Sequence, residues 1–479
     1  MSSYFADYAW LPHGWGAAVQ LECAAGAFVR VDEDAVHENT KRLGRFVLPG
    51  MPNLHSHAFQ RAMAGLAERR QSSAFGAERD EQKGSVPGRT SPQQDSFWTW
   101  RETMYAFAGR IGPDELRAVA AQLYVEMLQA GYTQVCEFHY LHHQPDGRPY
   151  ADHAAMSHAL IDAAAQAGIG LTLLPTLYMT GGFDGRPLSE RQRRFGHALD
   201  TYLRLIEDLA QRESPTLRIG VALHSLRAVP PDALRAVFDW LAQPPHATRP
   251  VHIHIAEQIG EVQDCLALRG ARPVEWLLDH APLDARWCLV HATHMTPDET
   301  RRVAQSGAVA GLCPTTEANL GDGLFPLKDF LDADGTFGIG SDSHISVSPV
   351  EELRWLEYGQ RLHTRHRNIA VSELTDSVGE TLWGNALFGG AAASGAALGA
   401  LEGDVAARAD LIVLDDDAPL LAARTPEHAL DTFLFAGNSN LVRDVMVAGD
   451  WCVRGGRHRD AQRIAAAYRT AVERLAREV

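Results

Sequence analysis

Lysine is nearly absent from this sequence of 479 residues. Only Lys41, Lys83 and Lys328 are present, and arginine supplies the rest of the 44 basic residues. The acidic residues number 60, so the formal net charge is −16 at pH 7. A chain with this charge repels phosphate backbones and anionic lipid headgroups. The composition therefore argues against nucleic-acid binding and against a role at a membrane surface.

Cysteine and long apolar stretches are scarce as well. The uncharged run Phe388–Leu401 is mostly glycine and alanine and is too short to span a bilayer. The N-terminus lacks the basic and apolar regions of a signal peptide. The six cysteines are scattered without a CxxC pair or disulfide-like clustering; they are Cys23, Cys136, Cys265, Cys288, Cys313 and Cys452. We expect a cytoplasmic protein, with a symmetric homodimer as the default assembly.

Apolar runs that end in polar residues predict eight strands at fairly regular intervals. Most of them are apolar almost throughout, as expected for parallel strands buried on both faces. Helical patterns lie between them, for example at Pro113–Ala130, where a proline opens the pattern and Gly131 follows it. The predicted strands are Arg45–Leu48, Thr133–Phe138, Leu171–Leu177, Arg218–Leu223, Val251–Ala256, Trp287–Ala292, Ala308–Cys313 and Thr336–Ser341.

Strands that alternate with helices predict a parallel α/β architecture. Eight such units over residues 51 to about 390 fit the size of a (β/α)8 barrel of the TIM type. An open doubly wound sheet is the alternative, but no Gly-rich phosphate loop follows the first strand. We expect residues 49–399 to form the catalytic barrel, and residues 1–48 and 400–479 to form a small β-sandwich domain. The polar residues 69–94 are predicted to be an insertion near the mouth of the barrel.

Two histidines follow the first expected strand, in the run Pro49-Gly50-Met51-Pro52-Asn53-Leu54-His55-Ser56-His57. Side chains at positions i and i+2 of an extended segment point to the same side, so His55 and His57 can converge on one ion. Imidazole suits zinc and other late first-row metals. Taken alone the pair is a weak signal, because two histidines bonded to backbone carbonyls near a turn would give the same sequence.

Polar residues of the same kinds recur at the ends of other expected strands. Strand five carries His254, strand six ends at His291, and strand eight is followed by Asp342. In a (β/α)8 barrel the carboxyl ends of the strands meet around one cavity. Polar groups buried there are costly without a partner. An ion with several ligands satisfies all of them, so we expect a metal site at this end of the barrel.

This set, with its His-Ser-His run and the run Gly340-Ser341-Asp342, resembles the amidohydrolase superfamily over essentially the whole chain. The resemblance implies a hydrolase whose metal ligands are His55, His57, His254 and Asp342. His291 is then an active-site histidine close to the metal, and His252, one pleat deeper than His254, is structural.

The resemblance also bears on the number of ions and on the chemistry. Two-metal members usually carry a carboxylated lysine on strand four, and none of the three lysines ends a barrel strand, so we expect one divalent ion, with zinc as first choice. Single-metal members with a glutamate soon after the strand-five histidine are typically deaminases, which places Glu257 in the active site. Asp342 would take a proton from the metal-activated water, Glu257 would hold or protonate the substrate nitrogen, and His291 would orient the nucleophile. The alternative for Glu257 is a carboxylate at a helix start.

Three longer runs narrow the expected substrate. Residues Leu48–Arg61, Asp95–Glu102 and Leu223–Val229 are similar to segments of amidohydrolases that convert N-formimidoyl-L-glutamate to N-formyl-L-glutamate and ammonia in bacterial histidine degradation. Arginine forks suit the two carboxylates of such a substrate. The substrate contacts that this similarity implies are Gln60, Arg101, Tyr140 and Arg227.

Two other functions remain open at this point. One is a mononuclear metal aminohydrolase for a nucleobase or a guanidine-like compound, whose pocket should offer aromatic stacking and no pair of arginines. The other is a metal-binding barrel that serves as a catalytically silent scaffold. The presence of both Asp342 and His291 argues against the scaffold.

Overall fold

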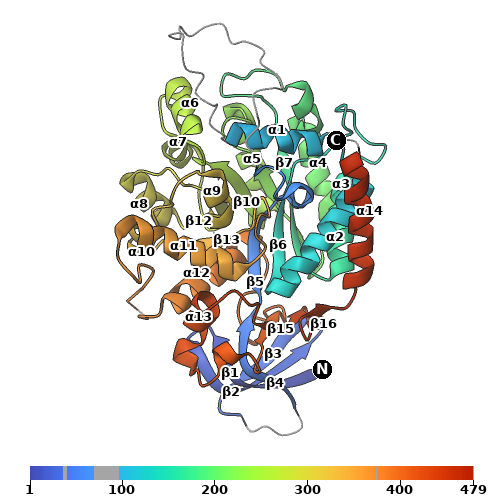
Figure 1. Ribbon diagram of the computed structural model, residues 1–479. Helices are drawn as coiled ribbons and strands as arrows, with labels where there is room; N and C mark the ends of the chain where they lie inside the picture. The colour runs from blue at the N-terminus through green and yellow to red at the C-terminus, as the bar shows by residue number, and fades with distance from the viewer. Residues whose placement is uncertain (36–39, 69–96, 374, 478–479) are drawn as a thin grey trace, which may run out of the picture.

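The computed structural model describes the chain except for residues 36–39, 69–96, 374 and 478–479 (Figure 1). The polar insertion predicted at residues 69–94 therefore lies outside the described residues. Two sheets organise the rest: a barrel of parallel strands, and a separate sheet that lies below it in Figure 1. No described helix is long and apolar enough to cross a membrane.

The barrel strands follow one another in chain order, and each neighbouring pair is parallel. They are β5 (Met51–Ser56), β6 (Tyr132–His139), β7 (Gly170–Leu177), β9 (Val221–Leu223), β10 (Val251–Ile255), β11 (Trp287–His291), β12 (Val309–Leu312) and β13 (Phe337–Ile339), with β8 (Leu217–Ile219) paired to β7. Between the last strand and the first, an isolated parallel bridge joins Asp342 to Ser56. This bridge brings the polar end of the eighth strand beside the His-Ser-His run.

Helices surround the barrel, as the alternating pattern predicts. They are α1 (Phe97–Ala108), α2 (Pro113–Ala130), α3 (Ala155–Ala167), α4 (Leu199–Ala210), α5 (Pro231–Leu241), α6 (Ile259–Arg269), α7 (Pro273–His280), α8 (Pro297–Ser306), α9 (Pro314–Leu320), α10 (Leu327–Asp332), α11 (Pro349–Thr364) and α12 (Val378–Ser394), with the short η1 (Ala58–Met63), η2 (Glu190–Phe195) and η3 (His246–Thr248). The predicted helix Pro113–Ala130 is confirmed, and Gly131 ends it with a φ of 103°. A left-handed residue after the last turn favours glycine, which explains this boundary.

The second sheet is built from both ends of the chain, as expected. Its eight strands form one hydrogen-bonded path in the order β17-β16-β15-β14-β4-β1-β2-β3. They are β1 (Ser2–Leu11), β2 (Gly14–Ala24), β3 (Ala27–Asp32), β4 (Lys41–Pro49), β14 (Leu411–Leu414), β15 (Val442–Val447), β16 (Asp450–Arg454) and β17 (Arg457–His458). A separate apolar core packs on this sheet, with Val19, Leu21, Phe28 and Leu411 fully buried.

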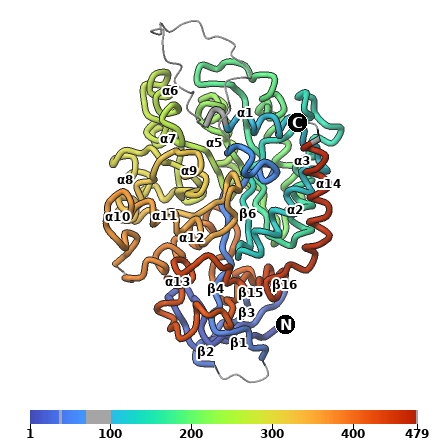
Figure 2. The backbone as a smooth tube through the Cα atoms, in the orientation of Figure 1, coloured from blue at the N-terminus to red at the C-terminus, as the bar shows by residue number. Residues whose placement is uncertain are grey.

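One predicted barrel strand is wrong. Arg45–Leu48 lies in β4, which pairs with β1 and β14 in the second sheet, and the first barrel strand is β5, directly after Gly50. Two buried strands in succession give one long apolar run, so the pattern cannot show which of them enters the barrel. Residues 400–479 also contain the short η4 (Pro419–Leu421) and the helices α13 (Pro426–Phe435) and α14 (Ala461–Arg477). Figure 2 shows α14 alongside α2 of the barrel, away from the second sheet.

Candidate active site

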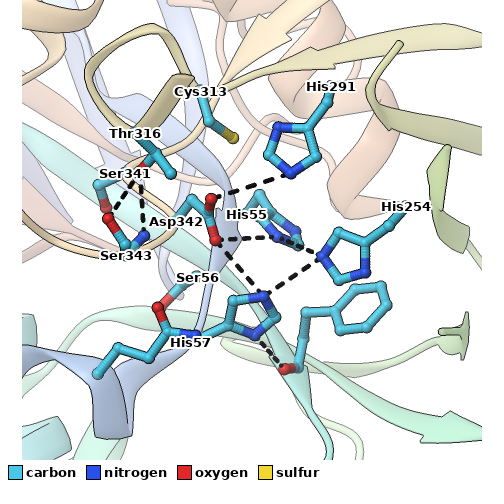
Figure 3. A network of polar contacts seen from close by, with 12 residues as sticks. His55, Ser56, His57, His254, His291, Cys313, Thr316, Ser341, Asp342 and Ser343 are labelled. Carbon is cyan, nitrogen blue, oxygen red and sulfur yellow. Dashed lines mark hydrogen bonds and ion pairs between the residues drawn. The ribbon is translucent and has the colours of Figure 1, made fainter. Parts of the chain in front are cut away.

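Three of the predicted metal ligands meet where the first and eighth barrel strands end. The backbone N–H of Asp342 donates to the carbonyl of His55 (3.0 Å), and the N–H of His57 donates to the carbonyl of Asp342 (3.2 Å). These bonds hold Oδ1 of Asp342 at 3.5 Å from Nε2 of His55 and 3.4 Å from Nε2 of His57 (Figure 3). All three side chains are buried. Residues 285 or more positions apart thus share one small space.

His254, on β10, completes the group. Its Nε2 lies 3.1 Å from Nε2 of His55 and 3.3 Å from Nε2 of His57. Nδ1 of His57 lies 2.8 Å from the carbonyl of Phe138, and Nδ1 of His254 lies 3.0 Å from the carbonyl of His224. A carbonyl accepts only, so both protons are on Nδ1, and the two Nε2 lone pairs face each other.

This arrangement fits a metal ion. The Nε2 atoms of His57 and His254 lie 3.3 Å apart, and their lone pairs repel each other unless a cation lies between them. A histidine whose Nδ1 proton is held by a hydrogen bond commonly binds zinc through Nε2. Burial lowers the pKa of His55 and of His254 well below the usual value, and neighbouring histidines add to the effect. Neutral imidazoles are the form that binds metal. Among the residues that the structure describes, three groups of side chains have ligand atoms close enough for one ion: His55, His254 and His291; His55, His57 and Asp342; and His291, Cys313 and Asp342.

His291 ends β11 and lies among carboxylates. Its Nε2 is 3.9 Å from Oε1 of Glu257 and 3.9 Å from Oδ2 of Asp342, and its Nδ1 is 3.3 Å from Oε1 of Glu317. Burial by itself lowers the pKa of His291, but Glu257 and the hydrogen bond to Glu317 outweigh it and raise that pKa to about 10. Burial also raises the pKa of Glu257. Both raised pKa values favour the protonated forms of His291 and Glu257, so these two groups can hold protons in the site.

Another buried carboxylate, that of Glu137, supports the backbone of the His-Ser-His run. Glu137, on β6, accepts hydrogen bonds from the Ser56 hydroxyl (2.6 Å), the Ala58 N–H (2.6 Å) and the Tyr124 hydroxyl (3.3 Å). Burial raises the pKa of Glu137 to about 7, although these hydrogen bonds oppose the shift. Because Ser56 and Ala58 flank His57, Glu137 fixes the backbone on both sides of that histidine.

A pocket opens onto these groups. Its wall contains His57, His254, His291, Asp342 and Glu257 together with the four predicted substrate contacts, Gln60, Arg101, Tyr140 and Arg227. Five further aromatic or histidine rings line it, those of Trp100, Tyr105, Tyr178, Phe195 and His224. One cavity therefore offers the histidine and carboxylate group, two arginines and an aromatic wall.

The four predicted contacts come from four different parts of the barrel. Gln60, in η1, donates from Nε2 to the hydroxyl of Tyr140 (3.1 Å), which follows β6. Arg101, in α1, places its guanidinium 5.1 Å from the centre of the Tyr105 ring. Arg227 follows β9 and is partly exposed in the pocket. His252, in contrast, does not line the pocket, and its Nε2 lies 2.8 Å from the carbonyl oxygen of Ala393.

Sequence reasoning missed three supporting residues. Glu317 in α9 touches His291, Glu137 supports the first strand end, and the carbonyl of His224 fixes the tautomer of His254. Only His224 had a positional signal, because it directly follows Leu223 at the end of a predicted strand. The two glutamates lie inside an expected strand and an expected helix region, where nothing in the local pattern marks them.

Comparison with known proteins agrees with this geometry. The amidohydrolase family profile matches residues 46–452. The chain therefore belongs to the amidohydrolase family, a class of hydrolases. Within that class, a curated protein of Pseudomonas aeruginosa named formimidoylglutamate deiminase is 52% identical over 470 residues, which cover 98% of each chain.

Two solved structures share the fold. A crystal structure of an amidohydrolase from Brucella melitensis superimposes with a TM-score of 0.90 at 44% identity, over 99% of this chain and 100% of that one. An adenosine deaminase from Xanthomonas campestris, solved with bound zinc, superimposes with a TM-score of 0.78 at 21% identity, over 100% of this chain and 98% of that one. The (β/α)8 fold class and the hydrolase class expected from the sequence are both confirmed.

Proposed function

We propose that this protein hydrolyses N-formimidoyl-L-glutamate to N-formyl-L-glutamate and ammonia, as a cytoplasmic homodimer acting in histidine degradation. The observation that carries the proposal is the pocket, whose wall combines the histidine and carboxylate group with Arg101 and Arg227. The 52% identity to a formimidoylglutamate deiminase over nearly the whole chain supports the same substrate.

His55, His57, His254 and Asp342 would hold one divalent cation. Three imidazoles and one carboxylate are a donor set that suits zinc. When bound, such an ion supplies the Lewis acidity that turns water into a nucleophile at neutral pH.

The protein's own groups then move the protons. Asp342, which lines the pocket, accepts a proton from the attacking water. Glu257, whose pKa is raised by burial, holds a proton for the substrate nitrogen. The oxygen of water bonds to the formimidoyl carbon, the bond from this carbon to the terminal nitrogen breaks, and both water protons leave with that nitrogen as ammonia. His291 lies 3.9 Å from both carboxylates and orients them and the nucleophile.

The substrate's two carboxylates are assigned to the two arginines. Guanidinium groups bind carboxylates through paired, charge-assisted hydrogen bonds. Gln60 and Tyr140, already joined by a hydrogen bond, offer neutral donors beside His57. The aromatic wall is equally suited to a nucleobase, so the arginines are what favours the dicarboxylate over the nucleobase alternative.

The test is an ammonia-release assay with metal analysis of the same preparation. We expect about one zinc ion per chain and rapid release from N-formimidoyl-L-glutamate. Release should be slower from N-formimidoylglycine, which has one carboxylate, and absent from adenosine and guanine. Removal of the metal with a chelator should abolish release, and added zinc should restore it. Two ions per chain would contradict the single-metal site, and turnover of a purine alone would establish the alternative.

A further inference from the structure

A buried glutamate behind His291 has no place in the chemistry described so far. Glu317 lies in α9, is 3% exposed, and is absent from the pocket wall. Its Oε1 accepts the backbone N–H of Cys313 (3.0 Å) and lies 3.3 Å from Nδ1 of His291. The carboxylate thus joins the start of α9 to the end of β11. It does not line the pocket, so it can act on the reaction only indirectly, and His291 is the active-site residue that it contacts.

His291 itself is held in an unusual backbone conformation. Its φ is +68°, and that of Ala292 is +47°. Non-glycine residues in this region carry a conformational cost and persist where surrounding contacts fix them, often at functional sites. Contacts reach the imidazole from both edges: Glu317 at Nδ1, and Glu257 and Asp342 at Nε2.

The contact at Nδ1 determines what the other nitrogen can do. A carboxylate accepts a hydrogen bond, so Nδ1 carries a proton that is donated to Glu317. The ring can then neither flip nor adopt the other neutral tautomer without losing this bond. Nε2 remains directed at Asp342 and Glu257, the two groups assigned to proton transfer.

We propose that Glu317 is the positioning residue of His291: it accepts the Nδ1 proton and thereby presents Nε2 to the reacting groups. This inference rests on the proposed function for its kinetic consequences but not for its structural ones. Mutation of a residue that orients an active-site histidine in this way typically lowers activity by about 10- to 100-fold.

The kinetic test uses Glu317→Met, which keeps the length of the side chain and removes the acceptor. We expect kcat to fall about 10- to 100-fold, with little change in KM and no loss of zinc. Glu317→Gln, which retains an acceptor oxygen, should recover most of kcat. The matched control is Glu352→Met: Glu352 is also buried, and it binds the same helix through the N–H and hydroxyl of Thr315 (2.9 and 2.6 Å). Its loss should leave kcat nearly unchanged.

A double-mutant cycle separates positioning from a general structural role. In a His291→Asn background, Glu317→Met should cause almost no further loss of kcat. An equal loss in both backgrounds, or an equal loss in the Glu352 control, would overturn the proposal. If Glu317→Met does not fold, Glu317→Asp, which is one methylene too short to reach His291, takes its place with the same expected result.

A crystal structure of the zinc-loaded variant gives a readout that needs no turnover. The His291 ring should turn away from its present position, whereas an unmoved ring would refute the inference even if the substrate were a different one. Turnover of N-formimidoyl-L-glutamate by the unmodified protein tests the proposed function separately.

Discussion

Replacement of Arg227 by methionine is the sharpest probe of the proposed substrate. Methionine retains an unbranched apolar stem of similar reach but lacks the guanidinium fork. Arg227 lines the pocket beyond β9, outside the proposed group of metal ligands, so its loss should leave the histidine and carboxylate cluster intact. The substitution should therefore remove the proposed contact to one substrate carboxylate and little else.

The size of the effect follows from the burial of the site. Removing one partner of a buried charge pair costs about 3–5 kcal/mol, because the other charge is left without a partner. Arg227 is partly exposed, and water can replace part of the lost interaction. We therefore expect about 2–4 kcal/mol, which corresponds to a fall of about 30- to 1000-fold in kcat/KM. Most of the change should appear in KM, because the contact lies away from the reacting carbon and acts in the ground state as well.

The assay is steady-state ammonia release from N-formimidoyl-L-glutamate, with zinc content measured on the same samples. Arg218→Met is the matched control, because Arg218 lies in β8, donates to Thr248 (3.1 and 3.0 Å) and does not line the pocket. It should change kcat/KM less than about twofold, as surface substitutions generally do. Unchanged turnover by Arg227→Met at normal zinc content would refute the assigned carboxylate contact.

Three further predictions address the frame of the site. His254→Ala should lower the zinc content well below that of the unmodified protein and lower Tm, measured by metal analysis and thermal unfolding, and full zinc retention would contradict the assigned ligand set. Burial raises the pKa of Glu137 from an ordinary value of 4.5 to about 7, so between pH 4.5 and pH 7 this carboxyl is ionised in the unfolded chain and protonated in the folded one. The contribution of Glu137 to the free energy of unfolding should therefore fall by roughly 3 kcal/mol as the pH rises from about 4.5 to about 7. Urea unfolding of the metal-free protein and of Glu137→Gln should give a difference in the free energy of unfolding that changes with pH over this range. A difference that stays constant with pH would refute the raised pKa of Glu137. Gly389→Ala should cost at least about 1–3 kcal/mol in the same assay, because the added Cβ would lie 2.0 Å from the carbonyl oxygen of Phe337, and an unchanged unfolding midpoint would contradict that close approach.

The sequence predicted the barrel well where local pattern and chain order suffice. Each of the other seven predicted strands overlaps a strand of the barrel, because parallel strands buried on both faces leave continuous apolar runs. The first was assigned wrongly, since β4 and β5 are both buried and only Gly50 separates them. Which sheet a buried strand joins depends on distant partners, here β14 for β4.

In the candidate site, too, some residues could be predicted from the sequence and others could not. His55, His57, His254, His291 and Asp342 were predictable as a group because each lies at the end of a strand, and barrel topology brings strand ends together. Glu137 and Glu317 were not, because the site residues that they support lie 79 to 81 and 26 residues away and neither has a diagnostic spacing. Such supporting contacts depend on how helices and strands pack, and this information is not present in any short run of residues.

The pairing of β4 with β14 has a consequence for the nascent chain. These strands are adjacent in the second sheet, yet the whole barrel lies between them in the sequence, from residue 50 to residue 410. At about 5–20 residues per second, a ribosome needs roughly 20–70 s to deliver β14 after β4 has been made. During that time one edge of β4 is open, and an open apolar edge is a template for pairing with another chain. Synthesis at a high level should therefore favour aggregation of incomplete chains, and chaperone binding to this edge would suppress it.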